Sequence, residues 1–210
     1  MMRRRVVAIA AGSLVACAAS LPIGERPTIA ADEPDQVTAV LKHDFHDRGP
    51  AKLSRVELDD VQRACNLYAD NPPASVAKPL EEAQLKTIKF PSDAHLLGDW
   101  KNGEKIAQNG RGSMWSDQPG EQAGGSCYNC HQLSPKEDSF GTVGPTLYRF
   151  GKIRGSGPDV QRYVYGKIYN AKAYNLCSQM PRLGYAGTLT EQQIKDVTAL
   201  LLDPASPVNQ

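Results

Sequence analysis

The stretch Gly125-Ser126-Cys127-Tyr128-Asn129-Cys130-His131 contains the densest chemistry in this sequence. Two thiols lie three positions apart and an imidazole follows at once, which is the C-x-x-C-H pattern that attaches c-type haem. In such a site each thiol forms a thioether to a haem vinyl group, and the imidazole binds the iron as its proximal axial ligand. The stretch therefore predicts one covalently attached haem c, held by Cys127, Cys130 and His131.

Three other interpretations of the two thiols are open. A structural zinc site needs a second Cys or His pair at ligand spacing, and none follows at a suitable distance. A thioredoxin-like redox motif is expected among alternating strands and helices, a pattern that this chain lacks. A disulfide between Cys127 and Cys130 would close a very short loop and gain little entropic stabilisation. Haem attachment is therefore the leading hypothesis.

The composition limits the kinds of partner that the protein could bind. The chain has 210 residues, enough for one domain with an appendage, and its 24 Lys and Arg nearly balance its 23 Asp and Glu. This balance gives no electrostatic basis for binding nucleic acid or an anionic membrane surface. No run reaches the roughly eighteen consecutive apolar residues of a membrane-spanning helix. We expect no nucleic-acid partner and no transmembrane segment.

Residues 1–31 have the pattern of a secretory signal peptide. Three arginines precede Val6–Ala19, an apolar stretch that is too short to span a bilayer. Small residues offer two cleavage sites, one at Ile29-Ala30-Ala31 just before Asp32 and one within Ala16–Ala19. Leu14-Val15-Ala16-Cys17 also has the form of a bacterial lipobox, which would make Cys17 a lipidated N-terminus. We expect export to the periplasm, with lipoprotein anchoring through Cys17 as the alternative.

Residues 32–91 predict an N-terminal extension of short helices, over 36–47, from Ser54 onward and over 79–88. Ser54 and Glu57 fit a capping box for the second of these helices. Because the segment has few large apolar residues, we expect it to pack against the rest of the chain. The proposed inner face of the second helix is Leu58, Val61, Cys65 and Tyr68.

From residue 92 the pattern predicts a helix over 97–109, a glycine-rich loop over 110–126 and a last helix. The last helix has Thr190 as N-cap with Gln193 three positions later, and it ends at Asp203-Pro204. No strand run exceeds a few residues. Such a mostly helical chain with long connections suits a fold organised around a cofactor.

Met180 is the stronger candidate for the sixth ligand of the iron. It follows His131 by 49 positions and precedes Pro181, which can hold a loop extended over the haem face. A thioether ligand raises the reduction potential and closes the iron to small molecules, which favours electron transfer over oxygen or peroxide chemistry. Met114 is a weaker candidate, and Met180 as a flexible core residue is the plain alternative.

Two further groups have a plausible role. The carbonyl of Pro145 could accept the Nδ1 hydrogen of His131, and Leu147 could pack on the haem edge, although a simple turn would explain the same residues. His43 and His46 could bind an adventitious metal, but two surface histidines are the simpler interpretation.

With Cys17 in the signal and two cysteines on haem, Cys65 and Cys177 remain. Two remaining cysteines in an oxidising compartment predict one disulfide. It would close a loop of about 112 residues, and the chain-entropy model assigns such a cross-link a stabilisation of roughly 4–5 kcal/mol. An intermolecular bridge, free thiols, or Cys177 as an iron ligand in one redox state are the alternatives.

Over roughly residues 92–209 the chain resembles SoxX, the cytochrome c subunit family of thiosulfate-oxidising bacteria. The haem motif alone is common to all c-type cytochromes, whereas the Trp-containing loop and the C-terminal tail are more specific. The resemblance rests on 110–116, 125–132, 144–147, 177–182 and the tail 201–209.

The resemblance implies a mono-haem subunit with His131 and Met180 as axial ligands, paired with a larger cytochrome, SoxA. In that family the pair joins thiosulfate oxidatively to a cysteine of the carrier SoxYZ, an L-cysteine S-thiosulfotransferase activity, and the chemistry is placed on SoxA. The electrons pass to a soluble cytochrome c. Compact members of the family do not need the segment before about Ser92.

We therefore predict a mainly α fold: a signal peptide over 1–31, a helical extension over 32–91 and a class I cytochrome c-like haem domain over 92–210. A free-standing mono-haem electron shuttle is the alternative function. A peroxidase or gas-sensing protein is a third, and it would require an open sixth position on the iron.

Overall fold

The computed structural model describes residues 33–118 and 120–210. Over this range the chain is mainly α-helical, as predicted, and the β pairing is limited to one isolated bridge between Arg48 and Ala51. Among the described helices, none has both the length and the apolarity needed to cross a membrane. The predicted signal segment 1–31, with Cys17, lies outside the described residues.

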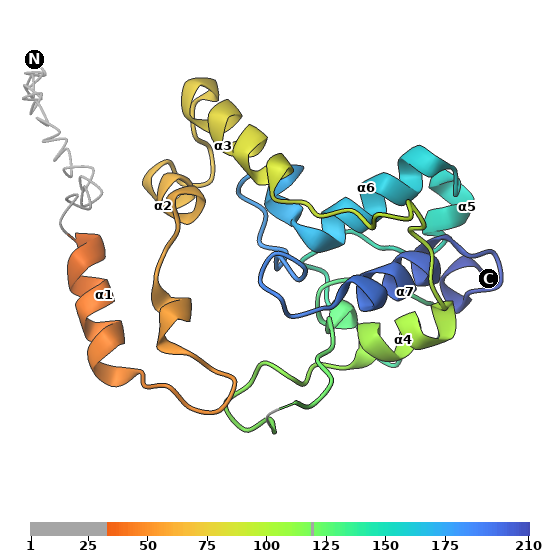
Figure 1. Cartoon of the computed structure of the whole chain (residues 1–210), viewed down its shortest axis with the longest axis horizontal. Coiled ribbons are helices and arrows are strands. Elements are labelled where there is room, and N and C mark those ends of the chain that lie inside the picture. The colour runs from red at the N-terminus through yellow and green to blue at the C-terminus, as the bar shows by residue number, and fades with distance from the viewer. Residues whose placement is uncertain (1–32, 119) are drawn as a thin grey trace, which may run out of the picture.

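The N-terminal extension forms an arm beside a larger helical body (Figure 1). The arm runs from α1 through η1 to α2 and α3, in orange to yellow in Figure 1. Its elements are α1 (Glu33–Asp44), the 3₁₀ helix η1 (Leu53–Val56), α2 (Asp60–Leu67) and α3 (Ala74–Lys86).

The predicted helix start at Ser54 is wrong. A 3₁₀ turn occupies 53–56, and α2 begins at Asp60 because Asp59 and Gln62 form the reciprocal capping box there. Asp59 accepts the Gln62 N–H and the Gln62 side chain accepts the Asp59 N–H, which satisfies two otherwise unpaired donors. Cys65 is buried on the inner face of α2, as expected, whereas Tyr68 is 38% exposed.

The other two arm helices are shifted from their predicted positions. The first ends at Asp44 rather than at residue 47. The third begins at Ala74, ahead of the predicted 79, because the extended backbone of Pro73 makes it the N-cap and leaves Pro79 inside the helix.

Three of the seven elements of the body lie where the sequence indicated helices or the haem motif, and two helices and two 3₁₀ turns were not predicted. The missed helices are α5 and α6; Pro158 at the first turn of α6 was an available start signal. The elements are α4 (Trp100–Gln108), η2 (Cys127–Asn129), α5 (Phe150–Arg154), α6 (Pro158–Tyr169), η3 (Ala171–Ala173), α7 (Glu191–Leu202) and η4 (Pro207–Asn209).

The crossing of α4 and α7 forms the centre of the body. Gly103 permits the close approach, since a Cβ there would collide with the Asp196 backbone. The predicted Thr190–Gln193 capping box at the start of α7 is confirmed. Asp196 is buried and accepts hydrogen bonds from the Asp99 N–H, the Asn102 amide and the Gln192 amide, which joins the two helices.

The C-terminal tail closes the body against α5 and α7. Asn209 is 1% exposed; its amide donates to the carbonyls of Leu201 and Asp203, and its oxygen accepts the Gly151 N–H. The tail therefore satisfies backbone groups at the end of α7 and in α5 that would otherwise lack partners.

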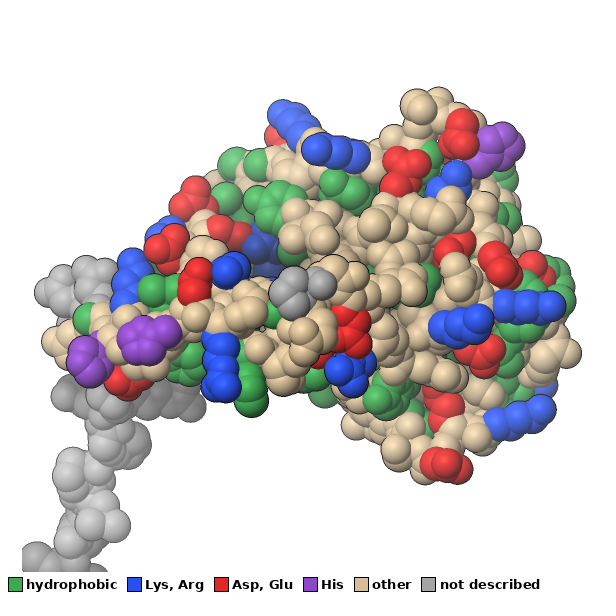
Figure 2. All heavy atoms as spheres, turned by 60° about the horizontal axis from the view of Figure 1, so that its bottom comes forward, with side chains coloured by type: hydrophobic (Ala, Val, Ile, Leu, Met, Phe, Trp, Pro, Cys, Tyr) green, Lys and Arg blue, Asp and Glu red, His purple; other side chains and the backbone are tan. Residues whose placement is uncertain are grey.

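A small second core joins the arm to the body. Val61 and Cys65 of α2 are buried together with Leu176 of the body, and Leu80 of α3 packs against them. The extension thus packs against the rest of the chain, as expected from its few apolar residues. Figure 2 shows Lys and Arg interspersed with Asp and Glu over the face that it presents, so that face has no extended area of one charge sign.

Candidate haem site

The haem motif folds into a tight turn. Cys127–Asn129 form η2, and the N–H groups of Cys130 and His131 both donate to the Cys127 carbonyl, at 3.1 and 2.9 Å. The turn starts from Ser126, which has a positive φ of 49°. Cys127 and Cys130 are both free thiols, so the disulfide alternative is not formed.

His131 is oriented by its second nitrogen. Nδ1 lies 2.7 Å from the carbonyl oxygen of Pro145, which can only accept, so Nδ1 carries a hydrogen, and in the neutral ring Nε2 keeps its lone pair. This hydrogen bond is the one expected from the sequence. It is also the usual way in which a ligating histidine is held in one tautomer.

Gly144 makes this orientation possible. A Cβ at this position would lie 2.5 Å from Nδ1 and 2.8 Å from Nε2 of His131, well inside contact distance. The Gly144 N–H donates to the Cys130 carbonyl at 2.8 Å, which fixes the 141–145 loop against the motif. Sequence reasoning named Pro145 and Leu147 in this loop but missed Gly144, although the Gly-Pro pair marked a special turn.

The donor set fits a covalently bound haem c. Two unpaired thiols, one imidazole with a free Nε2 and one thioether are the groups that such a haem requires. Cys127, Leu147 and Met180 are partly buried and pack against the same core cluster around α4, α6 and α7. Met114, the weaker ligand candidate, is 47% exposed in the 110–118 loop.

The chemistry of Cys127 does not match a redox-active C-x-x-C pair. Burial raises the pKa of its thiol to about 12. Reactive thiols of such pairs have a lowered pKa, because the thiolate is the nucleophile. Cys127 therefore stays a neutral thiol in the protein alone, which favours a structural or cofactor-attaching role.

The Trp-containing loop is held by the arm. The guanidinium of Arg48 lies 3.8 Å above the Trp115 ring, and Arg55 donates to the Ser113 carbonyl at 2.6 Å. Inside the loop, the buried Asp117 accepts the N–H groups of Gly112 and Met114. These backbone hydrogen bonds, that of Met114 foremost, hold the pKa of Asp117 below its ordinary value.

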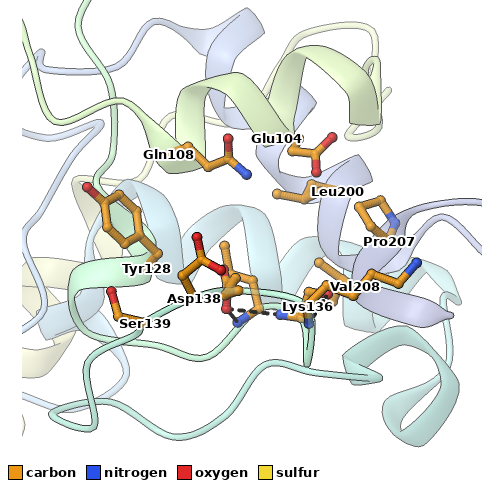
Figure 3. A pocket seen from close by; sticks show the side chains of 12 residues that line it. Glu104, Gln108, Tyr128, Lys136, Asp138, Ser139, Leu200, Pro207 and Val208 are labelled. Carbon is orange, nitrogen blue, oxygen red and sulfur yellow. Dashed lines mark hydrogen bonds between the residues drawn. The ribbon is translucent and has the colours of Figure 1, made fainter.

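A cavity of about 470 Å³ lies next to the motif (Figure 3). Its walls come from α4, α7 and the segment 133–139, with Tyr128 of the motif on one side. Its lining includes neither His131 nor Met180. The candidate ligands His131 and Met180 therefore lie outside the cavity wall, and the motif turn borders the cavity only through Tyr128.

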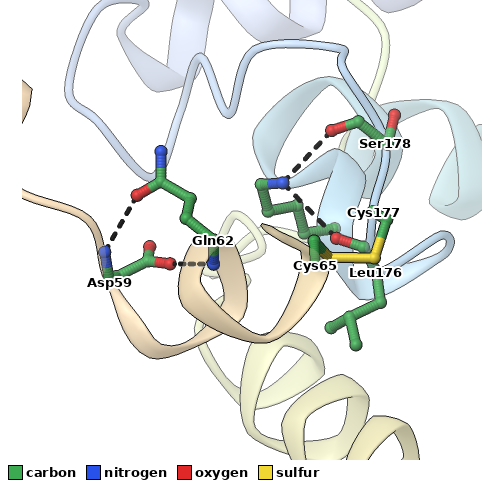
Figure 4. The surroundings of a disulfide bond; sticks show 7 residues. Asp59, Gln62, Cys65, Leu176, Cys177 and Ser178 are labelled. Atoms are coloured by element: carbon green, nitrogen blue, oxygen red, sulfur yellow. Dashed lines mark hydrogen bonds between the residues drawn. A yellow bond between two sulfur atoms is a disulfide. The ribbon is translucent and has the colours of Figure 1, made fainter. Parts of the chain in front are cut away.

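The disulfide predicted between Cys65 and Cys177 is present, with a Cα–Cα distance of 5.5 Å (Figure 4). It joins α2 of the arm to the segment that precedes Met180. The alternatives for these two cysteines, free thiols or an iron ligand, do not agree with this bond. His43 and His46 are both on the surface, where His43 contacts Asp44.

Comparison with known proteins places the chain in a family. None of the protein-family models matches it. Among solved structures, SoxXA from P. pantotrophus is similar over 51% of this chain and 82% of the compared chain, with 24% identity and a TM-score of 0.37. An "Uncharacterized lipoprotein" of Aquifex aeolicus (strain VF5) is 35% identical over 156 residues, 72% of this chain and 73% of the relative. The chain belongs to the same family as this lipoprotein.

Proposed function

We propose that this protein is a mono-haem c-type cytochrome. Cys127 and Cys130 attach the haem, and His131 and Met180 are the axial ligands. The observation that supports this most directly is the Pro145–His131 hydrogen bond in a C-x-x-C-H turn, because it presents Nε2 as an iron donor. When bound, the haem supplies reversible one-electron exchange at its iron.

The chain's own residues set the conditions for that exchange. Pro145 holds the proximal imidazole in one tautomer, and Gly144 leaves room for the ring. Leu147 adds apolar surface to the pocket. Met180 would hold the iron with a neutral thioether, which would keep out small ligands and raise the potential. These roles favour electron transfer over peroxidase or gas-sensing chemistry.

We further propose that the protein is the electron-transfer subunit of a periplasmic SoxAX-type complex. The partner would be a SoxA-type cytochrome and the substrate carrier a SoxYZ-type protein. Conjugation forms a bond between the carrier cysteine and thiosulfate sulfur, releasing the thiol proton and two electrons that pass singly to a soluble cytochrome c. The support is the resemblance in the haem, Trp and tail stretches of the sequence.

Export is part of the proposal. Residues 1–31 would be removed as a signal peptide, leaving the extension 32–91 and the haem domain 92–210. The name of the Aquifex relative supports export and gives weight to the alternative of lipid anchoring through Cys17. Mass analysis of the mature N-terminus separates the two: cleavage near Asp32 supports a soluble protein, and a lipidated Cys17 supports the anchored form.

The deciding experiment is purification of the native protein from its periplasm, with its haem-stained polypeptides counted. A stable pair with a larger c-type cytochrome is the expected result, followed by thiosulfate conjugation to the carrier. A single mono-haem species at every stage would instead support the free electron shuttle. Replacement of Met180 by Ala should abolish the Met–iron absorption band; an unchanged spectrum would remove Met180 as the ligand.

A further inference from the structure

The segment that contains Met180 is attached to the N-terminal arm at two points. The first is the disulfide, which bonds Cys177, three residues before Met180, to Cys65 of α2 (Figure 4). Leu176 is buried against Cys65 and Val61 in the small core between arm and body. This end of the segment is therefore fixed both covalently and by packing.

The second attachment lies on the other side of Met180. Arg182, two residues after it, contacts Asp59 at the N-terminus of α2, with Nη2–Oδ2 at 2.5 Å. Its Nη1 also donates to Gln84 of α3 at 3.3 Å, and its guanidinium lies 4.6 Å from the centre of the Tyr185 ring. The Arg182 side chain is only 15% exposed, so solvent screens this ion pair less than an exposed one.

Lys172 of η3 reinforces the first attachment from the body. Its ammonium group donates to the carbonyls of Leu176 and Ser178, at 3.4 and 3.2 Å, and these two residues flank Cys177. Figure 4 shows both hydrogen bonds beside the disulfide. The Ser178 hydroxyl in turn accepts the Met180 N–H at 3.2 Å. A continuous set of contacts thus leads from α2 to the Met180 backbone.

The chain between the two attachments is too short to allow much movement. Met180 follows Cys177 by three positions and precedes Arg182 by two, so these stretches of chain span at most about 11 and 7 Å. We propose that the Cys65–Cys177 disulfide and the Asp59–Arg182 ion pair position Met180 for the iron. The arm would then be a brace for the sixth ligand. This inference rests on the proposed haem ligation.

The test compares two Asp→Asn variants of the complete haem protein at neighbouring positions, only one of which contacts Arg182. Asp59→Asn retains an N-cap side chain, since Asn caps helices as well as Asp, but removes the charge that binds Arg182. Asp60→Asn is the control: it removes the neighbouring charge, whose side chain is 88% exposed and lies 3.6 Å from Arg63. Cys65→Ser with Cys177→Ser removes the other attachment.

The readout is the rate at which added imidazole displaces Met180 from ferric iron, together with the Met–iron absorption band and the reduction potential. Because displacement requires the segment to open, we expect Asp59→Asn to raise the rate about tenfold and the double Ser variant to raise it at least as much. Asp60→Asn should match the native protein. Should the double variant not accumulate, Asp59→Asn alone decides the question.

Equal displacement rates for Asp59→Asn, Asp60→Asn and the native protein would overturn the inference. Met180→Ala separates this failure from failure of the proposed function. If Met180→Ala loses the Met–iron band while Asp59→Asn behaves as the control, Met180 is the ligand and the arm does not position it. If Met180→Ala keeps the native spectrum, the proposed ligation itself is wrong.

Discussion

Replacement of Gly144 by Ala tests the proximal side of the proposed site. The new Cβ would lie 2.2 Å from Cε1 of His131, its nearest ring atom, and ordinary contact begins at 3.4 Å, so the ring must withdraw by about 1.2 Å. We expect a displacement of that size to break the Nδ1–Pro145 hydrogen bond, now 2.7 Å, because a retreat of about 1.2 Å from the carbonyl would lengthen it to about 3.9 Å.

The loss of stability in Gly144→Ala has two sources, the steric overlap and the broken hydrogen bond. Overpacking costs about 1–3 kcal/mol and the lost hydrogen bond about 1 kcal/mol, which together predict a loss of roughly 2–4 kcal/mol in the free energy of unfolding. Without its hydrogen bond, His131 should also become a weaker donor to iron, which alters the potential.

The assay is urea unfolding of the purified haem protein, combined with a redox titration. Gly157→Ala is the matched control, because no atom lies within 4 Å of a Cβ at that position. A Gly144→Ala protein with the stability and potential of the control would refute the account of Gly144 as the residue that admits the His131 ring.

Three other outcomes are expected. Asp196→Ala should lower the free energy of unfolding by about 3 kcal/mol, because the Asp99 N–H and the amides of Asn102 and Gln192 lose the buried carboxylate that accepts from them; a loss below about 1 kcal/mol in urea unfolding would contradict this. For Asp59, burial opposes ionisation, but the Gln62 N–H and Arg182 outweigh it and hold the pKa below the ordinary 3.8. The stabilisation by ionised Asp59 is therefore present above that pH and lost as the pH falls through the lowered pKa. The difference in the free energy of unfolding between the native protein and Asp59→Asn should accordingly shrink on acidification. A difference that does not change with pH would show that the charge plays no part. Replacement of both Cys127 and Cys130 by Ala should abolish covalent haem, so that mass analysis gives the bare polypeptide, and covalent haem that persists would exclude these thiols as the attachment site.

The features that sequence analysis predicted correctly are local or depend on counting. The Thr190–Gln193 capping box is local, since its partners lie three residues apart, and the His131–Pro145 hydrogen bond joins two neighbouring motifs. The Cys65–Cys177 pair followed from an even number of remaining thiols in a chain predicted to be exported. The start of α2 was misplaced because two capping patterns, at Ser54 and at Asp59, compete within six residues.

The sequence by itself determined the helical class and the partner of Cys65, and it named the candidate haem ligands. The tertiary structure alone decided how these groups are held. Gly144 meets the His131 ring across 13 residues, and Asp59 meets Arg182 across 123. Such contacts leave no periodic or spacing signal in the sequence, because they form only when packed elements bring distant side chains together. Long loops can close in many ways at similar entropic cost, so the sequence spacing does not select one pairing before the core is formed.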